Sequence, residues 1–547
     1  MESSKLLESR NDEHQHWNNL YEIFKSKVDQ NRSSPLIIFH GKHVSYYSIL
    51  SMADSMAESM KNRLNIRKGD YVAICLPLSP QFFVSFLALQ KIGAIAVPLD
   101  PEIKVYELNN VMGLLKLKTV ICINTTDLEL EHSQGLESVI LVKIQDFLPF
   151  EKAVARTAKT LGKNASRISK DLTVTRFSDL IYDVKGDGEF TDPERDPSVA
   201  IISASRNGEL QAMLFTPASL LNTASSIAKS LSQSRGRFKI ASFLPPFVPA
   251  SFQFSVILPI LLGGTVITSF ERVNYYRTFF LSSLFDCDYM FASPWDLSEI
   301  LRERIPNMAI KSLKGIITST YLLSGEIRNN VEKIYGTRVI EYYGLPEMLG
   351  VTHIQPTDRT KQKPGSPGIP IPNVESKILE EKTHEELEQP ATGELYIRGP
   401  GLFTSVFPEL ADPEEYFIDD YFDTGDLASM DQDGLYYIED RRREAITSHG
   451  ILVSSREIET LISGVEGVKE VAVVGIAENN ANESILAVVS SDNATESLTT
   501  KIMQVCRKSL SHYKVPQRVE IRKELPKSMS GKILKRQIIE EHHKQDQ

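Results

Sequence analysis

The sequence has few of the residues that cross-link small secreted domains or bind structural metals. Only four of its 547 residues are cysteines, and Cys75, Cys122, Cys287 and Cys506 lie far apart, without a CxxC pair. A disulfide framework or a zinc site needs cysteines or histidines at close, regular spacing. The N-terminal stretch up to Trp17 also lacks the apolar core of a secretory signal. We therefore expect neither disulfides nor zinc, and a reducing, cytoplasmic location.

Positive charge is in short supply as well. The formal net charge is -10, whereas a general nucleic-acid binder neutralises phosphates with a basic face. We therefore predict no nucleic-acid partner. Hydrophobic residues make up 41% and charged residues 24% of the chain, which is the balance of a soluble globular protein. A chain of this length exceeds one ordinary core, so two or more domains are expected, with the oligomeric state left open.

The chain has no uninterrupted apolar run of membrane-spanning length. Segment 240–270 carries no charged residue and would be long enough to cross a bilayer as a helix. Four prolines interrupt it, however, and the pair Gly263-Gly264 follows. Prolines break helices in their interior. The segment is therefore predicted to form a strand, a loop and a buried helix.

One stretch has the opposite character. Residues 152–176 are rich in lysine and arginine, and the sequence Phe-Leu-Pro-Phe precedes them at 147–150. Basic residues beside exposed aromatic residues can bind an anionic membrane surface. A solvated surface helix explains the same pattern, and we prefer it. Peripheral membrane contact through 147–176 is kept as the alternative.

The order of strand and helix signals predicts an α/β fold. Residues 71–76 are typical of a buried strand, 80–92 of a helix and 94–99 of a second strand. Such a βαβ unit builds a parallel sheet with helices on its faces. After Gly393 the chain changes to short β-like runs, and a charged cluster follows at 439–444. Because such clusters often mark linkers, we place a domain boundary there, giving domains 1–439 and 440–547.

Five short motifs in the C-terminal half carry a family resemblance. They are Tyr343-Gly-Leu-Pro-Glu347, Gly393-Glu-Leu-Tyr-Ile-Arg-Gly-Pro400, Thr424-Gly-Asp426, Asp440-Arg441 and Gly531-Lys532-Ile533. In this order and spacing they resemble the AMP-forming acyl-CoA synthetases and related adenylate-forming enzymes. The runs 363–373 and 512–516 are most similar to medium- and long-chain fatty acyl-CoA ligases. Ordered motifs predict a fold more firmly than an activity.

The resemblance implies both a fold and a reaction. The fold is α/β, with a large N-terminal domain of stacked α/β subdomains plus a β-barrel-like part, followed by a small mobile α/β C-terminal domain. The reaction uses ATP, Mg²⁺ and CoA to activate a carboxylic acid, here expected to be a fatty acid. The acid attacks the α-phosphate to give acyl-AMP, and the CoA thiolate then displaces AMP. In the family the small domain rotates between the two steps.

The resemblance also assigns roles to individual residues. Glu347 matches the magnesium ligand, for which a hard oxygen donor is required. Asp426 matches the acid that accepts both ribose hydroxyls. Arg441 matches an arginine near ribose and phosphate, and Lys532 the mobile lysine that stabilises charge as acyl-AMP forms. The other residues expected at the nucleotide are Tyr343, Gly344, Thr424, Ser203, Ser205, Arg206, Gly208 and Tyr321.

The phosphate loop departs from the family pattern. In the run 203–212, Gln211 stands where the family has a lysine, and Glu209 adds negative charge beside the phosphates. Most of the loop's glycines are missing, although their freedom lets backbone N–H groups approach phosphates. Arg206 is the candidate for the lost positive charge.

Three further positions around the nucleotide differ. Val248 replaces a histidine, and Pro346 replaces a threonine whose hydroxyl faces the phosphates. The run 318–322 replaces a small-residue strip on which adenine lies, so Tyr321 would crowd the base or stack on it. These departures support a second hypothesis, a non-catalytic homologue that binds an acyl chain, acyl-CoA or a partner protein. A stand-alone adenylation domain serving a carrier protein is a third alternative.

Overall fold

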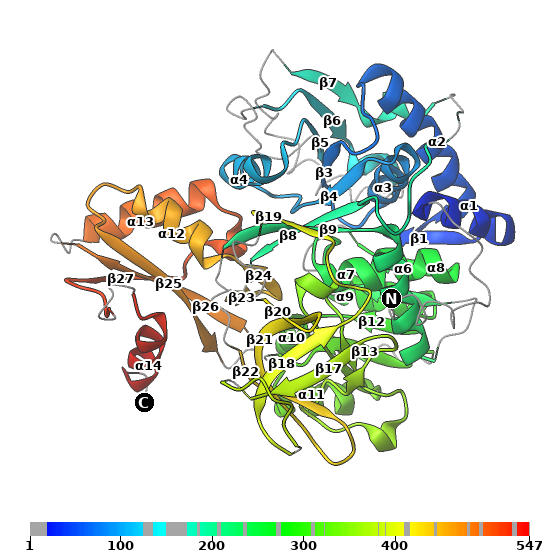
Figure 1. The fold of residues 1–547 in the computed structure, drawn as a ribbon. Coiled ribbons are helices and arrows are strands. Elements are labelled where there is room, and N and C mark those ends of the chain that lie inside the picture. The colour runs from blue at the N-terminus through cyan, green and yellow to red at the C-terminus, as the bar shows by residue number, and fades with distance from the viewer. Residues whose placement is uncertain are drawn as a thin grey trace.

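The computed structural model describes most of the chain, as a large domain and a smaller one beside it (Figure 1). The described residues are 19–123, 135–148, 172–182, 186, 188–204, 209–232, 238–269, 275–307, 312–321, 323–380, 382–388, 390–409, 416–441, 446–478, 482–491, 496–527 and 533–545. The division into a large N-terminal and a small C-terminal α/β part agrees with the predicted fold class.

The βαβ unit predicted near the N-terminus is present. Strand β3 (Tyr71–Cys75), helix α3 (Pro80–Ile92) and strand β4 (Ile95–Pro98) follow one another, and the two strands pair in parallel. The backbone N–H of Phe82 donates to Ser79 Oγ at 3.2 Å, which caps the first turn of α3. The helix ends at Gly93. The local signals in the sequence therefore gave the bounds of the helix, and they placed the ends of the two strands to within one residue.

The unit belongs to an eight-stranded sheet with the order β19-β9-β8-β4-β3-β5-β6-β7. Strands β4, β3, β5, β6 and β7 pair in parallel, and β8 also runs parallel to β4. At the other edge β9 and β19 pair antiparallel. The remaining bounds are β5 (Thr119–Ile123), β6 (Ser138–Val142), β7 (Thr173–Arg176), β8 (Val199–Ala204), β9 (Leu210–Phe215) and β19 (Ser405–Phe407).

A second sheet of nine strands has the order β16-β15-β14-β13-β12-β10-β11-β1-β2. Its six central strands, from β14 to β1, are parallel. The bounds are β1 (Pro35–Phe39), β2 (Lys42–Ser45), β10 (Lys239–Ser242), β11 (Thr265–Thr268), β12 (Tyr289–Phe291), β13 (Gly315–Ser319), β14 (Val339–Tyr343), β15 (His353–Ile354) and β16 (Ile369–Pro370).

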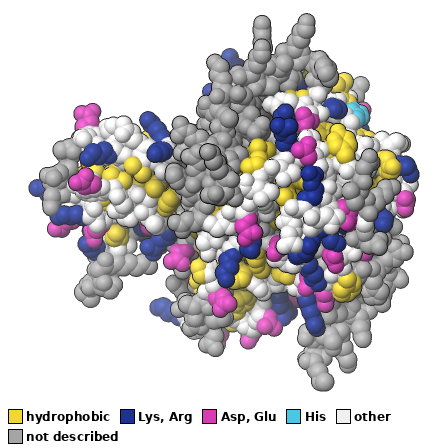
Figure 2. Space-filling model, turned by 90° about the horizontal axis from the view of Figure 1, so that it is seen from above, with side chains coloured by type: hydrophobic (Ala, Val, Ile, Leu, Met, Phe, Trp, Pro, Cys, Tyr) yellow, Lys and Arg dark blue, Asp and Glu magenta, His cyan; other side chains and the backbone are white. Residues whose placement is uncertain are grey.

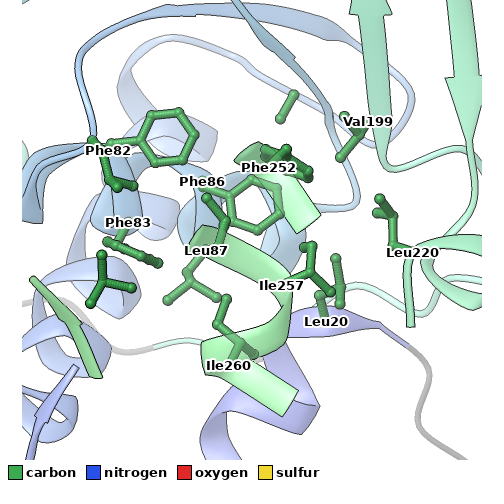
Figure 3. Packing of buried hydrophobic residues seen from close by; sticks show 14 of the residues in the cluster. Leu20, Phe82, Phe83, Phe86, Leu87, Val199, Leu220, Phe252, Ile257 and Ile260 are labelled. Atoms are coloured by element: carbon green, nitrogen blue, oxygen red, sulfur yellow. The ribbon is translucent and has the colours of Figure 1, made fainter. Parts of the chain in front are cut away.

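The two sheets stack through a shared layer of helices, as the resemblance implies. One buried cluster joins residues of both sheets to helices α1 (Leu20–Asn31), α2 (Tyr46–Arg63), α3 and α6 (Pro217–Ser230). Within it, Phe86 of α3 meets Phe252 edge to face, with ring centroids 5.5 Å apart (Figure 3). The outer faces are covered by α4 (Val105–Leu115) on the first sheet and, on the second, by α9 (Tyr275–Leu284), α10 (Pro294–Arg302) and α11 (Gly325–Tyr335).

The charge-free run 240–270 folds as the sequence predicts, over the part that the structure describes. Strand β10 is followed by a loop and then by one buried helical stretch with three parts: α7 (Pro249–Phe252), the π-helical η5 (Gln253–Ile257) and α8 (Leu258–Leu262). Strand β11 follows. Nowhere among the described residues is there a helix that is both long and apolar enough to cross a membrane.

A third sheet, antiparallel and five-stranded, completes the large domain. It is formed by β17 (Glu375–Leu379), β18 (Gly393–Arg398), β20 (Phe417–Ile418), β21 (Tyr421–Met430) and β22 (Tyr436–Arg441). This sheet is the part that the resemblance describes as barrel-like. Strand β22 extends across the boundary proposed at 439/440, and residues 442–445 lie outside the described part.

The small domain has a core of its own, built from its strands and helices. A three-stranded sheet, β25-β26-β27, is accompanied by a two-stranded hairpin, β23-β24. The bounds are β23 (Ile446–Ser448), β24 (Ile451–Val453), α12 (Ser455–Ser463), β25 (Glu470–Glu478), β26 (Asn482–Ser490), α13 (Glu496–Ser509), β27 (Arg518–Arg522) and α14 (Lys535–Gln545).

On the face seen in Figure 2, basic and acidic side chains are intermixed rather than gathered by sign. The absence of a nucleic-acid partner stays a prediction. Most of the segment considered for membrane contact, 149–171, lies outside the described residues. Peripheral membrane contact therefore stays a prediction.

Candidate functional site

A cleft lies where the small domain meets the ends of strands from both large sheets. On the large domain its walls include the ends of β8 and β13, the start of β9 and the residues after β14. The hairpin β23-β24 and the segment around Lys514 close it from the small domain. In open α/β sheets, ligands bind beyond the carboxyl ends of parallel strands. The residues used below that line it are Ser203, Leu244, Val248, Ala250, Tyr321, Tyr342, Gly344, Gly450, Glu107, Glu457 and Lys514.

Three of the residues expected at the nucleotide lie together. The Tyr343 hydroxyl donates to Asp426 Oδ2 at 2.7 Å, and the Asp426 side chain is buried. The backbone N–H of Asp426 donates to Thr424 Oγ1 at 3.1 Å, and Thr424 Oγ1 in turn donates to the carbonyl of Leu395 at 2.7 Å. Arg441 pairs with Asp426 across β22 and β21. The Tyr343 hydroxyl therefore orients the Asp426 carboxylate, and Thr424 fixes the Asp426 backbone.

Gly344 has a steric reason to be glycine. A Cβ atom at this position would overlap the backbone of Gly350 and Val351. Gly350 itself is packed against the backbone of Ala250, at the start of the buried helix. The loop after β14 is thus pressed onto the N-terminal end of α7. This contact places Tyr343 and Gly344 beside the cleft.

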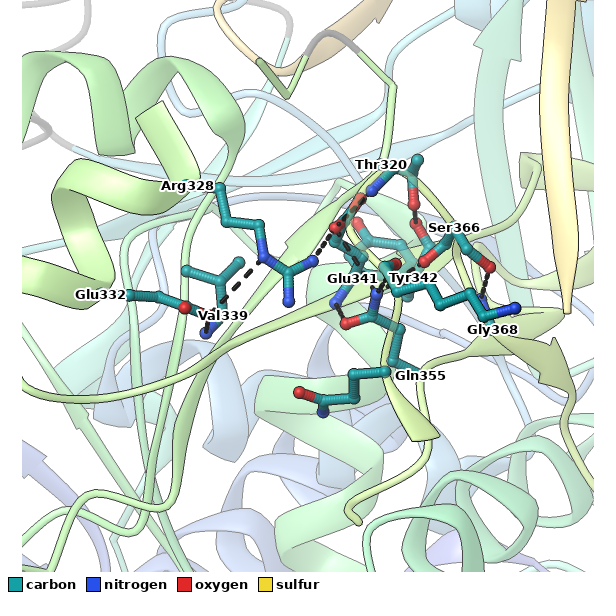
Figure 4. Close-up of polar contacts among 12 residues, drawn as sticks. Thr320, Arg328, Glu332, Val339, Glu341, Tyr342, Gln355, Ser366 and Gly368 are labelled. Carbon is teal, nitrogen blue, oxygen red and sulfur yellow. Dashed lines mark hydrogen bonds and ion pairs between the residues drawn. The ribbon is translucent and has the colours of Figure 1, made fainter. Parts of the chain in front are cut away.

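A buried ion pair supports the same loop from behind (Figure 4). Glu341 of β14 is fully buried and pairs with the Arg328 guanidinium of α11. Gln355 accepts from the backbone N–H of Glu341 at 3.1 Å and donates to the carbonyl of Ser366 at 2.8 Å. Burial raises the pKa of Glu341, and the charge of Arg328 opposes that rise. The network fixes the end of β14, from which Tyr342 and Tyr343 project.

Glu347 and Gln211 come together, which the sequence gave no means to foresee. Glu347 is buried on the short 3-10 turn Pro346–Met348, and Gln211 is buried on β9. Gln211 Nε2 donates to Glu347 Oε1 at 3.4 Å. Ser203, opposite Gln211 in the β8–β9 register, also lines the cleft. The residue at the family's lysine position therefore contacts the expected magnesium ligand.

Four predicted site residues have no structural description. Ser205, Arg206 and Gly208 lie in 205–208, and Lys532 lies in 528–532, both outside the described residues. For Arg441 the backbone is described and the side chain is not. The predicted roles of these five residues stay predictions.

Tyr321 bridges the two domains. Its hydroxyl donates to Glu483 Oε1 of β26 at 2.7 Å. The same carboxylate accepts from the backbone N–H of Thr447 in the hairpin. The sequence places Tyr321 beside the adenine but gives no sign of Glu483 as a partner. The end of β13 is therefore joined directly to the small domain.

A second contact between the domains is a buried charge cluster. Lys514 Nζ lies 2.6 Å from Glu107 Oε1 of α4 and 2.7 Å from Glu457 Oε2 of α12. Glu107 Oε2 also accepts from the Ser511 hydroxyl at 2.7 Å. Burial alone lowers the pKa of Lys514, but the two carboxylates outweigh it and hold that pKa well above its usual value. In the sequence, Lys514 belongs to the run 512–516 that carries part of the family resemblance, and no local pattern there indicates this cluster.

Comparison with known proteins gives two family matches. The model of the AMP-binding enzyme family matches residues 24–407, and that of the AMP-binding enzyme C-terminal domain matches residues 457–532. The long-chain-fatty-acid–CoA ligase of Bacillus subtilis (strain 168) is 26% identical, covering 93% of this chain and 92% of that protein. The probable 4-coumarate–CoA ligase 1 of Dictyostelium discoideum is 24% identical, with coverage of 94% and 93%.

Solved structures share the fold. An o-succinylbenzoate CoA synthetase from Bacillus subtilis, bound with its product analogue OSB-NCoA, superposes with a TM-score of 0.77 at 19% identity, covering 95% of this chain and 98% of that one. The Mycobacterium tuberculosis fatty acyl CoA synthetase gives a TM-score of 0.63 at 21% identity, with coverage of 96% and 98%. The agreement extends over both domains.

Proposed function

This chain belongs to the AMP-binding enzyme family, and on that premise we propose that it activates a hydrophobic carboxylic acid with ATP, through acyl-AMP, to an acyl-CoA. The family matches and the ligases among the relatives confirm the prediction of an AMP-forming acid–thiol ligase that uses ATP, Mg²⁺ and CoA. Those relatives are named for long-chain fatty acids and for 4-coumarate. The family therefore covers acids of different sizes and leaves the acid itself open.

The observation that carries the proposal is the Tyr343–Asp426 pair. A buried carboxylate held by a tyrosine hydroxyl and a backbone turn is preorganised to accept the two hydroxyls of a ribose. Gly344 lines the cleft directly after Tyr343, and Arg441 lies opposite Asp426 in the register of β21 and β22. We assign the ribose to Asp426, with Tyr343, Gly344 and Thr424 around it.

Glu347 fits the role of magnesium ligand. It is a buried carboxylate directly after Pro346, which lines the cleft, and carboxylate oxygens are the donors that Mg²⁺ prefers. When bound, the ion neutralises charge between phosphates. The Gln211 amide orients one carboxylate oxygen of Glu347. We assign the phosphates to Ser203, Ser205, Arg206 and Gly208.

The arrangement of the domains suits the second step of the reaction. Gly450 of the hairpin approaches Ser293 so closely that a Cβ atom would overlap it, so the hairpin reaches well into the cleft. Helix α14 lies below the sheet β25-β26-β27 of the small domain in the view of Figure 1. Lys532 precedes this helix, and we assign it to the first step, after a rotation about the 439–444 segment.

A reducing, cytoplasmic compartment stays our proposal. The four cysteines are buried and lie far apart in the sequence, without a CxxC pair. This is not the spacing of a disulfide framework, which supports a reducing compartment.

The contact between Gln211 and Glu347 favours one alternative, a non-catalytic homologue that binds an acyl chain, acyl-CoA or a partner protein. A neutral amide supplies no charge to the phosphates, and it occupies an oxygen of the expected metal ligand. In this alternative the cleft no longer binds ATP productively. The two functions differ in whether ATP binds to the folded protein and stabilises it.

ATP binding measured by thermal shift separates them. An ATP concentration 100 times the dissociation constant should stabilise the ligase by about 2.7 kcal/mol. Gln211→Lys should tighten binding, and Arg206→Ala should weaken it by about 1–3 kcal/mol, as for a charge-assisted contact. If Mg-ATP leaves the melting temperature of the parent and of both variants unchanged, the non-catalytic function replaces the ligase.

A further inference from the structure

The cleft ends against three packed aromatic rings. Phe254 projects from the π-helical segment η5, Phe291 from β12 and Tyr342 from β14. The ring centroids of Phe254 and Phe291 are 4.8 Å apart, and that of Tyr342 lies 5.8 Å from the first and 5.9 Å from the second. Both phenylalanines are fully buried, and only Tyr342 reaches the cleft wall. We call these residues the aromatic floor.

The aromatic floor lies where the apolar part of the acid would enter. The nucleotide end of the cleft is marked by Gly344, and the wall next to it is apolar, formed by Leu244, Val248 and Ala250. Behind this wall the buried helix α7–α8 packs onto strands β12–β14. An acyl chain that extended beyond the wall would have to pass between that helix and that sheet. The aromatic floor fills this space.

Tyr342 is held in place by its backbone as well as by its ring. Its carbonyl accepts from the Thr320 backbone N–H at 2.9 Å and from the Thr320 hydroxyl at 3.2 Å. The preceding residue, Glu341, is anchored by the buried Arg328 pair. Well-packed cores admit additional atoms only by straining their side chains. A longer chain could therefore enter only by breaking the ring contacts of a buried tyrosine.

We propose that Tyr342, backed by Phe254 and Phe291, limits the acid pocket in depth, so that this enzyme takes a compact acid. A short aliphatic or single-ring carboxylic acid fits the cleft, and a long acyl chain is excluded. This inference rests on the proposed function, since it concerns the acid of the same reaction. It departs from the names of the long-chain relatives because it follows from side chains of this chain.

The test removes the Tyr342 ring from the aromatic floor, and a matched control removes the ring of another buried tyrosine. Tyr342→Ala opens the space between helix and sheet. Tyr289→Ala is the control, because Tyr289 is also a buried tyrosine, on β12, and packs against Phe238 outside the cleft wall. Should Tyr342→Ala fail to fold, Tyr342→Val is the second variant, since a β-branched residue suits a strand. All are assayed as full-length chains.

The readout is acid-dependent exchange of pyrophosphate into ATP, with butanoate, benzoate, octanoate and dodecanoate. For the parent we expect the highest kcat/KM with butanoate or benzoate, and a fall of at least roughly tenfold at dodecanoate. Tyr342→Ala should raise kcat/KM with dodecanoate by a similar factor, and Tyr289→Ala should leave it unchanged. A parent that uses dodecanoate as well as butanoate overturns the inference and leaves the proposed function intact.

A binding measurement covers the case in which no acid supports exchange in any variant, which would contradict the proposed function itself. The melting temperature is then followed with dodecanoate alone. A rise in Tyr342→Ala that is absent from the parent and from Tyr289→Ala supports the aromatic floor. An equal rise in the parent, or an absence of any rise in Tyr342→Ala, overturns it.

Discussion

Replacing Lys514 by methionine should release the small domain from the large one. Methionine keeps the length of the side chain and removes its charge. Lys514 stands between Glu107 of the large domain and Glu457 of the small one, at 2.6 Å and 2.7 Å. The two carboxylate side chains are 2% and 1% exposed. Without the lysine, two buried negative charges would face each other across the interface.

The size of the effect follows from that burial. Removing one partner of a buried ion pair costs about 3–5 kcal/mol, because the remaining charge is left uncompensated. Here the carboxylates belong to different domains, so separating the domains relieves the cost without unfolding either core. The equilibrium between the described arrangement and a detached one should therefore shift by more than roughly a hundredfold.

The two half-reactions provide the assay. With supplied acyl-AMP, formation of the thioester should fall in Lys514→Met, while formation of acyl-AMP from ATP should be retained. Lys508→Met is the matched control, because Lys508 is an exposed lysine on α13 of the same domain. The reasoning would be refuted if Lys514→Met formed thioester at the parent rate, or if both half-reactions fell equally.

The pH dependence of the same cluster has a definite sign. The folded pKa of Lys514 is held well above its ordinary value of 10.5. Its stabilising contribution is therefore complete below that ordinary value and is lost only as the pH rises towards the higher folded value. The contribution of Lys514 to the interface should be insensitive to pH between about 6 and 9. A contact that weakened within this interval would have to depend on another group.

Four further predictions concern single residues. Asp426→Asn should weaken ATP binding by about 1.5–3 kcal/mol, and Tyr343→Phe by about 0.5–1.5 kcal/mol, as measured by calorimetry, because one removes a charge and the other a single hydrogen bond. Lys532→Ala should abolish acyl-AMP formation and spare thioester formation from supplied acyl-AMP; equal loss in both steps would contradict its assignment. Burial lowers the pKa of His353 from 6.5 to about 3. The stability that neutral His353 contributes is therefore present above pH 6.5 and is lost as the pH falls towards 3. Below pH 6 the free energy of unfolding should therefore depend less steeply on pH in His353→Gln than in the parent.

Local features of the fold could be predicted because their causes are local. Helix α3 begins directly after Ser79, with Pro80 as its first residue, and ends directly before Gly93. The prolines of 240–270 exclude a membrane helix on steric grounds alone. The order of the motifs also led us to expect both Tyr343 and Asp426 at the nucleotide, and in the structure the Tyr343 hydroxyl donates to the Asp426 carboxylate.

The contacts that the sequence did not reveal join distant segments. Gln211 and Glu347 are 136 residues apart, and Tyr321 and Glu483 are 162 apart. No periodicity or short motif specifies such pairs, since they depend on how two sheets and two domains are placed. Tyr342 is a similar case. In the sequence it is one aromatic residue beside a motif, and only the packing of η5 on β12 and β14 makes it the end of a pocket.

The most direct test of the central claim is an analysis of products. The full-length protein is incubated with Mg-ATP, CoA and a compact acid such as benzoate, and AMP, pyrophosphate and acyl-CoA are quantified by mass spectrometry. Our account predicts one AMP for each acyl-CoA, and at limiting ATP a fall of both products by roughly ten- to a hundredfold in Asp426→Asn. Nucleotide cleavage to ADP, or an absence of AMP and acyl-CoA with every acid from butanoate to dodecanoate, would contradict it.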